Sequence, residues 1–155
     1  MYDIQITERP ALTLIGSHHR GPYQEMGAVY QKVVGVISAQ NLWPQIQGVV
    51  GVAWDNPDIV PPADLRSFAG FQVAEDFEAP EGLERLHLQS GPYAELLYTG
   101  PYEGLRAVYQ YLMGDWFPKS GRQHAPSPSY EVYLNDPTTT APADLKTLIC
   151  APLTA

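Results

Sequence analysis

The stretch GPYQEMGAVYQ, residues 21–31, returns 79 positions later as GPYEGLRAVYQ, residues 100–110. In both copies a Gly-Pro pair stands where a helix can begin, because glycine serves as an N-cap and proline fits the first helical turn. The apolar residues that follow lie 3, 4, 7, 8 and 11 positions after the first of them, which is one face of an α-helix. They are Met26, Val29, Tyr30, Val33, Val34 and Ile37 in the first copy, and Leu105, Val108, Tyr109, Leu112, Met113 and Trp116 in the second.

Further matches extend this repeat over most of the chain. Asn56 matches Asn135 at the same offset, whereas ADLR at residues 63–66 returns as ADLK at residues 143–146, one position later. We assign this change of offset to one residue inserted in the loop after Asn135. Matches that keep the same order indicate that the protein contains two copies of one structural unit.

Each copy is expected to contain a strand before Gly-Pro-Tyr and two strands after the helix. A proline follows Trp43 in the first copy and Phe117 in the second, which predicts that each helix ends before it. The predicted strands are residues 11–18, 49–55 and 67–74 in the first copy and residues 93–98, 129–134 and 145–151 in the second, with a further short strand at residues 85–89.

The sequence therefore predicts an α+β fold built from a duplicated βαββ unit, with antiparallel sheets and one long helix in each half. The halves cover about residues 1–78 and 79–155 and are joined by an acidic connector at residues 75–84. Because a unit of roughly 70 residues has a thin core, we expect residues 1–155 to form a single domain. A pseudo-twofold axis between the halves would place a ligand-binding cleft there.

Charge and composition restrict the classes of partner. The chain has 9 Lys and Arg residues against 17 Asp and Glu residues, a formal net charge of -8. Direct binding to nucleic acid requires many cations to neutralise phosphates, so we expect none. An acidic surface suits a cationic small molecule or a basic patch on a protein partner, or it serves solubility alone.

No metal, cofactor or membrane is expected. The lone Cys150 can form neither an intramolecular disulfide nor a thiolate cage for a metal, and it favours a reducing compartment. His18-His19, His87 and His124 have no partners at metal-ligand spacing, so we expect structural roles for them. No leader pattern and no apolar run of membrane-spanning length is found, which predicts a cytoplasmic protein.

Glu131 is the strongest candidate for a functional residue. It lies in the middle of the predicted strand SYEVYL, residues 129–134, where glutamate is unusual and costly to bury unpaired. A buried carboxylate at this place could recognise a cationic ligand or act as a general base. Alternatively, the carboxylate lies in water or pairs with Arg or Lys on an exposed face.

Aromatic residues complete the expected ligand-binding set. Tyr133 shares a strand face with Glu131. Trp54 is the repeat-mate of Tyr133 at the offset of 79, so Tyr133 and Trp54 are both expected to line the cleft. Val52 is the repeat-mate of Glu131, and Tyr98 precedes the second Gly-Pro-Tyr. Packing between the halves is the alternative role for Trp54. Trp116, at the end of the second helical stripe, is expected in the core.

Three stretches of the second half resemble the GyrI-like small-molecule-binding family. They are Tyr98-Thr99-Gly100-Pro101-Tyr102-Glu103, Trp116-Phe117-Pro118-Lys119-Ser120-Gly121 and Tyr130-Glu131-Val132-Tyr133-Leu134-Asn135-Asp136-Pro137. The family includes the DNA gyrase inhibitory protein SbmC and the effector-binding domains of Rob- and BmrR-type transcription regulators. The resemblance implies that the whole chain is one GyrI-like domain. In multidrug-binding members a glutamate on the matching strand contacts lipophilic cations, which implies this role for Glu131. Tyr98 departs from the histidine that many members have there.

The resemblance leaves three hypotheses about function. In the first, the protein is a stand-alone binding protein that senses or sequesters a cationic or lipophilic aromatic compound, and it is not an enzyme. In the second, it modulates DNA gyrase by protein contact, which its acidity favours. In the third, it hydrolyses cyclopropane-bearing toxins, with Glu131 as a general base on water and Tyr133 or Trp54 stacking on the substrate. Binding makes the fewest demands on the residues and ranks first.

Overall fold

The computed structural model describes residues 2–154 and consists of two compact units. Pro10–Ser90 form the first-repeat unit, and Met1–Arg9 together with Gly91–Ala155 form the second-repeat unit. Within residues 2–154, no helix has the length and apolar character that crossing a membrane requires.

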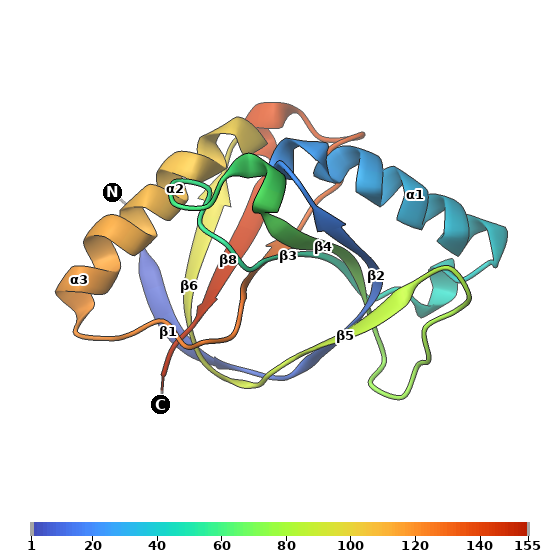
Figure 1. Cartoon of the computed structure of the whole chain (residues 1–155), viewed down its shortest axis with the longest axis horizontal. Coiled ribbons are helices and arrows are strands. Elements are labelled where there is room, and N and C mark those ends of the chain that lie inside the picture. Colours follow the sequence, from blue (N-terminus) through green and yellow to red (C-terminus); the bar gives the residue numbers. More distant parts are fainter. Residues whose placement is uncertain (1, 155) are drawn as a thin grey trace. The chain divides into compact units, whose positions relative to one another are not determined.

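The first-repeat unit is a four-stranded antiparallel sheet with a helix on one face (Figure 1). Its strands lie in the order β3-β4-β2-β5, and helix α1 packs against β2 and β4. The core under α1 is made of Ile15, Val33, Ile37, Ala69, Phe71 and Val73. The elements are β2 (Leu12–Arg20), α1 (Met26–Ala39), β3 (Gly48–Ala53), β4 (Arg66–Val73) and β5 (Glu84–Leu88).

The second-repeat unit has the same architecture, with strand order β1-β6-β8-β7. The core between its sheet and its helical segment contains Ala94, Leu96, Val108, Leu112, Phe117, Ile149, Ala151 and Leu153. Trp116 packs on this cluster, as expected. The elements are β1 (Ile4–Arg9), β6 (Gly91–Thr99), α2 (Leu105–Tyr111), a π-helical segment (Leu112–Trp116), α3 (Phe117–Ser120), β7 (Ser129–Tyr133) and β8 (Lys146–Pro152).

These two units confirm the predicted βαββ duplication and add one edge strand to each copy. Strand β5 pairs with β2 in the first-repeat unit, whereas β1, from the start of the chain, pairs with β6 in the second-repeat unit. Strand β1 was not predicted from the sequence, although Ile4 and Ile6 alternate with polar residues. The expected boundary at residues 78/79 therefore does not coincide with the division into compact units. The pseudo-twofold axis and the cleft stay predictions.

The second helix does not end before Phe117-Pro118, and this prediction was wrong. It continues through the π-helical segment into α3 and stops at Gly121, which has a left-handed φ of 73°. The Phe117 N–H bonds to the Leu112 carbonyl oxygen, five residues back, so the backbone widens just before the proline. Pro118 then falls in the first turn of α3, where a missing N–H is tolerated.

The offset between the repeats changes earlier than expected. Val52 pairs with Phe68 in the first-repeat unit, and Val132 pairs with Leu148 in the second. Phe68 and Leu148 are 80 positions apart and follow the matched ADL motif, so Val52 and Val132 are the equivalent residues. The extra residue therefore lies before β7 and not after Asn135.

Candidate functional site

Glu131 lies on the side of the β7 strand that faces the helix. Its partner across the ladder is Ile149 of β8, which belongs to the core cluster under α2. Directly paired residues in a sheet point to the same face, so the Glu131 side chain points toward Val108 and the rest of α2. The backbone geometry therefore places the carboxyl group between sheet and helix, not in open water.

Two phenols hold the Glu131 carboxylate. Tyr109 of α2 donates from its Oη to Oε2 over 2.6 Å, and Tyr133 donates from its Oη to Oε1 over 2.7 Å. Tyr102 lies beside them, with its ring edge-on to Tyr133 at a centroid distance of 5.7 Å. Each carboxylate oxygen thus accepts a hydrogen bond, and tyrosine rings surround the charge.

Glu131 is a half-buried, partly desolvated anion without a protein cation beside it. Burial raises the pKa of Glu131, and the hydrogen bonds from Tyr109 and Tyr133 only partly oppose that rise. Burial also raises the pKa of Tyr102, and the nearby Glu131 charge raises it further. Among residues 2–154, no Lys or Arg side chain lies within ion-pair distance of Glu131. The site can therefore gain from a cation or a proton supplied from outside.

Tyr98 lies on the same sheet face as Tyr133 but serves the turn. Thr147 of β8 pairs with Tyr98 on one side and with Tyr133 on the other. The Tyr98 Oη donates a hydrogen bond to the Pro101 carbonyl oxygen over 2.8 Å. A Cβ on Gly104 would lie 2.0 Å from that hydroxyl, so the turn is shaped around it. This hydroxyl stabilises the second Gly-Pro-Tyr turn and does not contact Glu131.

The reasoning that grouped Trp54 and Val52 with Tyr133 was wrong. Val52, Phe68 and His18 pair across neighbouring strands and share one face of the first-repeat sheet, and Trp54 stacks on His18 at 5.8 Å. Helix α1 covers the opposite face, because Ala69, the residue after Phe68 in β4, belongs to the core cluster under α1. A shift of one residue in register moves a side chain to the other face of a sheet.

The true repeat-mates of the acidic site are small residues. Gly51 occupies the position of Glu131, and Ala53 occupies that of Tyr133. The carboxylate and its strand phenol therefore belong to the second copy alone.

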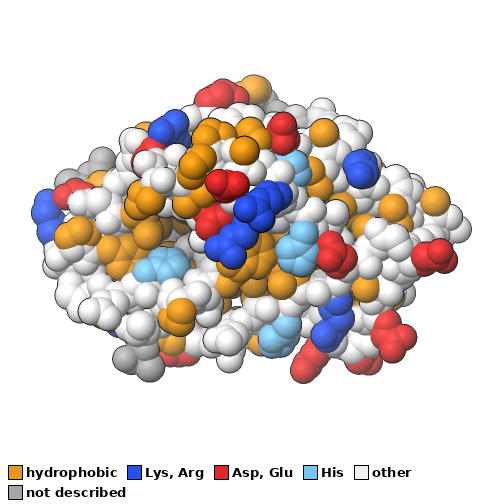
Figure 2. Space-filling model, viewed as in Figure 1, with side chains coloured by type: hydrophobic (Ala, Val, Ile, Leu, Met, Phe, Trp, Pro, Cys, Tyr) orange, Lys and Arg blue, Asp and Glu red, His pale blue; other side chains and the backbone are white. Residues whose placement is uncertain are grey.

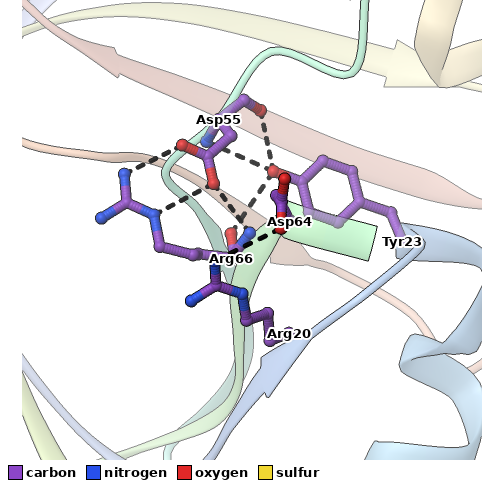
Figure 3. A network of polar contacts seen from close by, with 5 residues as sticks. All are labelled: Arg20, Tyr23, Asp55, Asp64 and Arg66. Atoms are coloured by element: carbon purple, nitrogen blue, oxygen red, sulfur yellow. Dashed lines mark hydrogen bonds and ion pairs between the residues drawn. The ribbon is translucent and has the colours of Figure 1, made fainter. Parts of the chain in front are cut away.

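Tyr23, the repeat-mate of Tyr102, has a structural role instead (Figure 3). Its Oη donates to the Asp55 carbonyl oxygen over 2.7 Å, and the Asp55 carboxylate pairs with the Arg66 guanidinium. The Arg66 guanidinium lowers the pKa of the Asp55 carboxyl. The tyrosine of the Gly-Pro-Tyr motif thus hydrogen-bonds the backbone after β3 in the first copy, whereas in the second copy its ring lies near the Glu131 carboxylate.

Sequence reasoning missed two members of the acidic site. Tyr109 had been placed on the apolar stripe of the helix, and Tyr102 had been read only as part of the turn motif. The signal that could have found Tyr109 is its hydroxyl at an inward-facing position, since a buried phenol needs a hydrogen-bond partner.

The histidines are engaged in separate contacts. His18 approaches Glu84 through Nδ1 at 3.1 Å, and His19 approaches Glu25 through Nε2 at 2.9 Å. Within residues 2–154, no three His, Cys, Asp or Glu side chains gather in a way that could hold a metal ion.

Comparison with known proteins agrees with this architecture. Residues 2–154 match the model of the GyrI-like small molecule binding domain. The chain belongs to the GyrI-like family. This confirms the resemblance seen in the repeat motifs.

One curated relative and two solved structures illustrate what this chain is similar to. A DNA gyrase inhibitor of Erwinia billingiae is 29% identical over 95% of this chain and 96% of its own length. The EcmrR C-terminal domain superposes with a TM-score of 0.78 at 16% identity, covering 99% of this chain and 98% of that domain. SAV2435 bound to tetraphenylphosphonium superposes with a TM-score of 0.70 at 16% identity, covering 99% of this chain and 94% of the SAV2435 chain. The two structural likenesses show the fold.

Proposed function

We propose that this GyrI-like protein binds a lipophilic aromatic cation and thereby senses or sequesters it. The observation that carries the proposal is the half-buried Glu131 carboxylate, which is held by two phenols and paired with no Lys or Arg among residues 2–154. In this proposal Glu131 is the counter-ion of the ligand.

The surroundings of Glu131 favour a cation whose charge is weakly hydrated. Desolvating a compact ammonium ion is costly, whereas a cation that spreads its charge over aromatic groups loses less hydration on entering an apolar site. The rings of Tyr102, Tyr109 and Tyr133 offer faces and edges to such a ligand. The tetraphenylphosphonium bound to SAV2435 is a cation of this class, which supports the proposal.

A thermal-shift titration tests this function. Tetraphenylphosphonium at a hundred times its Kd should raise the Tm of the wild type by roughly 5–10 °C, since binding to the folded state stabilises it by about 2.7 kcal/mol. A neutral probe of similar shape, triphenylphosphine oxide, should give a smaller shift. In Glu131→Gln the affinity for the cation should fall at least about tenfold, because a charge pair near 4 Å at an effective dielectric of 20 is worth about 4 kcal/mol.

The matched control removes one negative charge elsewhere. Glu78 is exposed, so Glu78→Gln changes the net charge without touching the site. Unchanged affinity in Glu131→Gln would exclude Glu131 as the counter-ion, and equal weakening in both variants would assign the effect to net charge alone.

A second function, modulation of DNA gyrase by protein contact, is favoured by the relatives. The Erwinia billingiae protein and a relative from Yersinia enterocolitica that is 30% identical are both named DNA gyrase inhibitors. An inhibitor that acts through its acidic surface should reduce supercoiling by purified gyrase, and Glu131→Gln should act as strongly as the wild type.

On the face drawn in Figure 2, Lys and Arg lie among Asp and Glu and form no basic stripe of the kind that binds nucleic acid.

A further inference from the structure

We propose that Ser129 and His124 form a nucleophile–base pair that hydrolyses small carboxylic esters with an apolar acyl group. The pair lies in the second-repeat unit, on residues that the acidic site does not use. Neither the family name nor the proposed cation site assigns this pair a role.

The hydrogen bonds of His124 define its tautomer. Nδ1 lies 2.6 Å from the Ala125 carbonyl oxygen, and Nε2 lies 2.8 Å from the Ser129 Oγ. A carbonyl oxygen can only accept, so the proton of the neutral imidazole is on Nδ1 and the lone pair is on Nε2. The Ser129 hydroxyl therefore donates to Nε2. A serine whose proton points at a base, with that base oriented by a third group, is the arrangement that activates a hydroxyl as a nucleophile.

The fold holds both side chains in place. His124 forms a bridge with Leu153, and the next residue, Ala125, donates its N–H to the Pro152 carbonyl oxygen over 2.8 Å. The imidazole also packs on the Phe117 ring at 5.7 Å. Ser129 is the first residue of β7, so its position is fixed by the sheet. Nucleophile and base thus come from anchored backbone, which keeps their geometry without a ligand.

A shallow cavity of about 320 Å³ adjoins the base and indicates the substrate class. His124 itself lines the cavity, next to the apolar side chains of Met113, Phe117 and Pro118. Arg122 and Gln123 complete the lining. The apolar side chains suit a short aliphatic acyl group, and Arg122, whose Nη2 donates to the Thr154 carbonyl oxygen over 3.4 Å, brings a positive charge to the cavity. Ser129 and His124 are both half-buried, and of the two His124 lines the cavity while Ser129 lies behind it at hydrogen-bond distance.

The reaction balances with water as the second substrate. The Ser129 Oγ attacks the ester carbonyl carbon while His124 Nε2 takes the hydroxyl proton. Collapse of the tetrahedral adduct breaks the bond to the alkoxide, which takes the proton from Nε2, and leaves an acyl-serine. Water then attacks the acyl-serine with His124 again accepting a proton. The products are a carboxylic acid and an alcohol, and Ser129 regains its proton.

The test combines ester hydrolysis with active-site labelling of the intact protein. The wild type should hydrolyse p-nitrophenyl butyrate above the buffer rate, and a fluorophosphonate should label the peptide that contains Ser129. Ser129→Ala should abolish labelling there and lower kcat/KM at least about a hundredfold, because the acyl-serine can no longer form. His124→Gln should lower the rate of labelling. The matched control is Ser17→Ala, since Ser17 Oγ bonds only to the neighbouring backbone, and it should behave as the wild type.

Two outcomes would overturn the proposal. One is a wild-type protein whose Ser129 peptide stays unlabelled while ester hydrolysis equals the buffer rate. The other is hydrolysis that survives in Ser129→Ala. Locating the label by mass on the wild type does not depend on whether any variant folds, and the Tm of Ser129→Ala shows whether a lost rate reflects unfolding.

Discussion

Replacing Glu131 by glutamine should stabilise the ligand-free protein at neutral pH, although it removes two charge-assisted hydrogen bonds. The amide is close in shape to the carboxylate and can still accept from one phenol and donate to the other. What the change removes is the cost of burying a charge, which outweighs the phenol contacts because the pKa of Glu131 is raised overall. We expect a gain on the order of 1 kcal/mol, the usual size of a single-residue effect, or about 2–4 °C in Tm for a domain of this size.

The pH dependence of this gain has a definite sign. The folded state binds the Glu131 proton more tightly than the unfolded chain does. The contribution of this proton to the free energy of unfolding is therefore fully present below the ordinary glutamate pKa. It is lost as the pH rises through the raised pKa of Glu131 in the folded protein. The Tm difference between Glu131→Gln and the wild type should be small near about pH 4 and should grow toward neutral pH.

Thermal unfolding followed by circular dichroism between acid and neutral pH measures this difference, with Glu78→Gln as the charge-matched control. A variant that melts below the wild type at neutral pH, or a difference that does not change with pH, would refute the reasoning from burial. Stabilisation of the empty protein together with weaker cation binding would show that the carboxylate is kept for the ligand and not for the fold.

Two further changes test the packing that supports the site. Gly104→Ala should lower the Tm by several degrees, because the new Cβ would lie 2.0 Å from the Tyr98 hydroxyl. In Gly35→Ala the new Cβ meets nothing within 4 Å, so this change should stabilise α1 by up to about 1 kcal/mol. Equal Tm changes in the two variants would contradict this expectation. Arg9→Met should destabilise by about 2 kcal/mol by leaving the Glu95 carboxylate unpaired at 17% exposure, and adding Glu95→Gln should recover part of the loss in chemical denaturation. A double variant no more stable than Arg9→Met would exclude the ion pair as the cause.

Much of the fold follows from local patterns in the sequence. The repeated stretch that begins at Gly21 and Gly100 identified both helices and the order of strands, because the spacing of apolar residues reports the period of each element. The same patterns missed β1, whose assignment depends on a partner strand more than 80 residues away. They also ended the second helix too early at Pro118, since a π-helical turn is not visible in apolar spacing.

The candidate site shows the same division between local and long-range information. An acid in the middle of a strand identified Glu131 from the sequence, because such a position is costly unless the charge has a use. Trp54 was grouped with it only by an assumed register, and the observed ladder puts Trp54 beside His18 instead. Tyr109 reaches Glu131 from a helix 22 positions earlier, which no spacing rule connects.

The sequence by itself determined the duplication, the α+β class, the GyrI-like family and the place of the unusual carboxylate. Only the tertiary structure decided which phenols hold that carboxylate, which strands complete each sheet, and that His124 is aligned with Ser129. The physical reason is that residue periodicity encodes which face of its own element a side chain occupies. Backbone pairing between distant strands decides what stands opposite that face, and one residue of register is enough to exchange the two sides of a sheet.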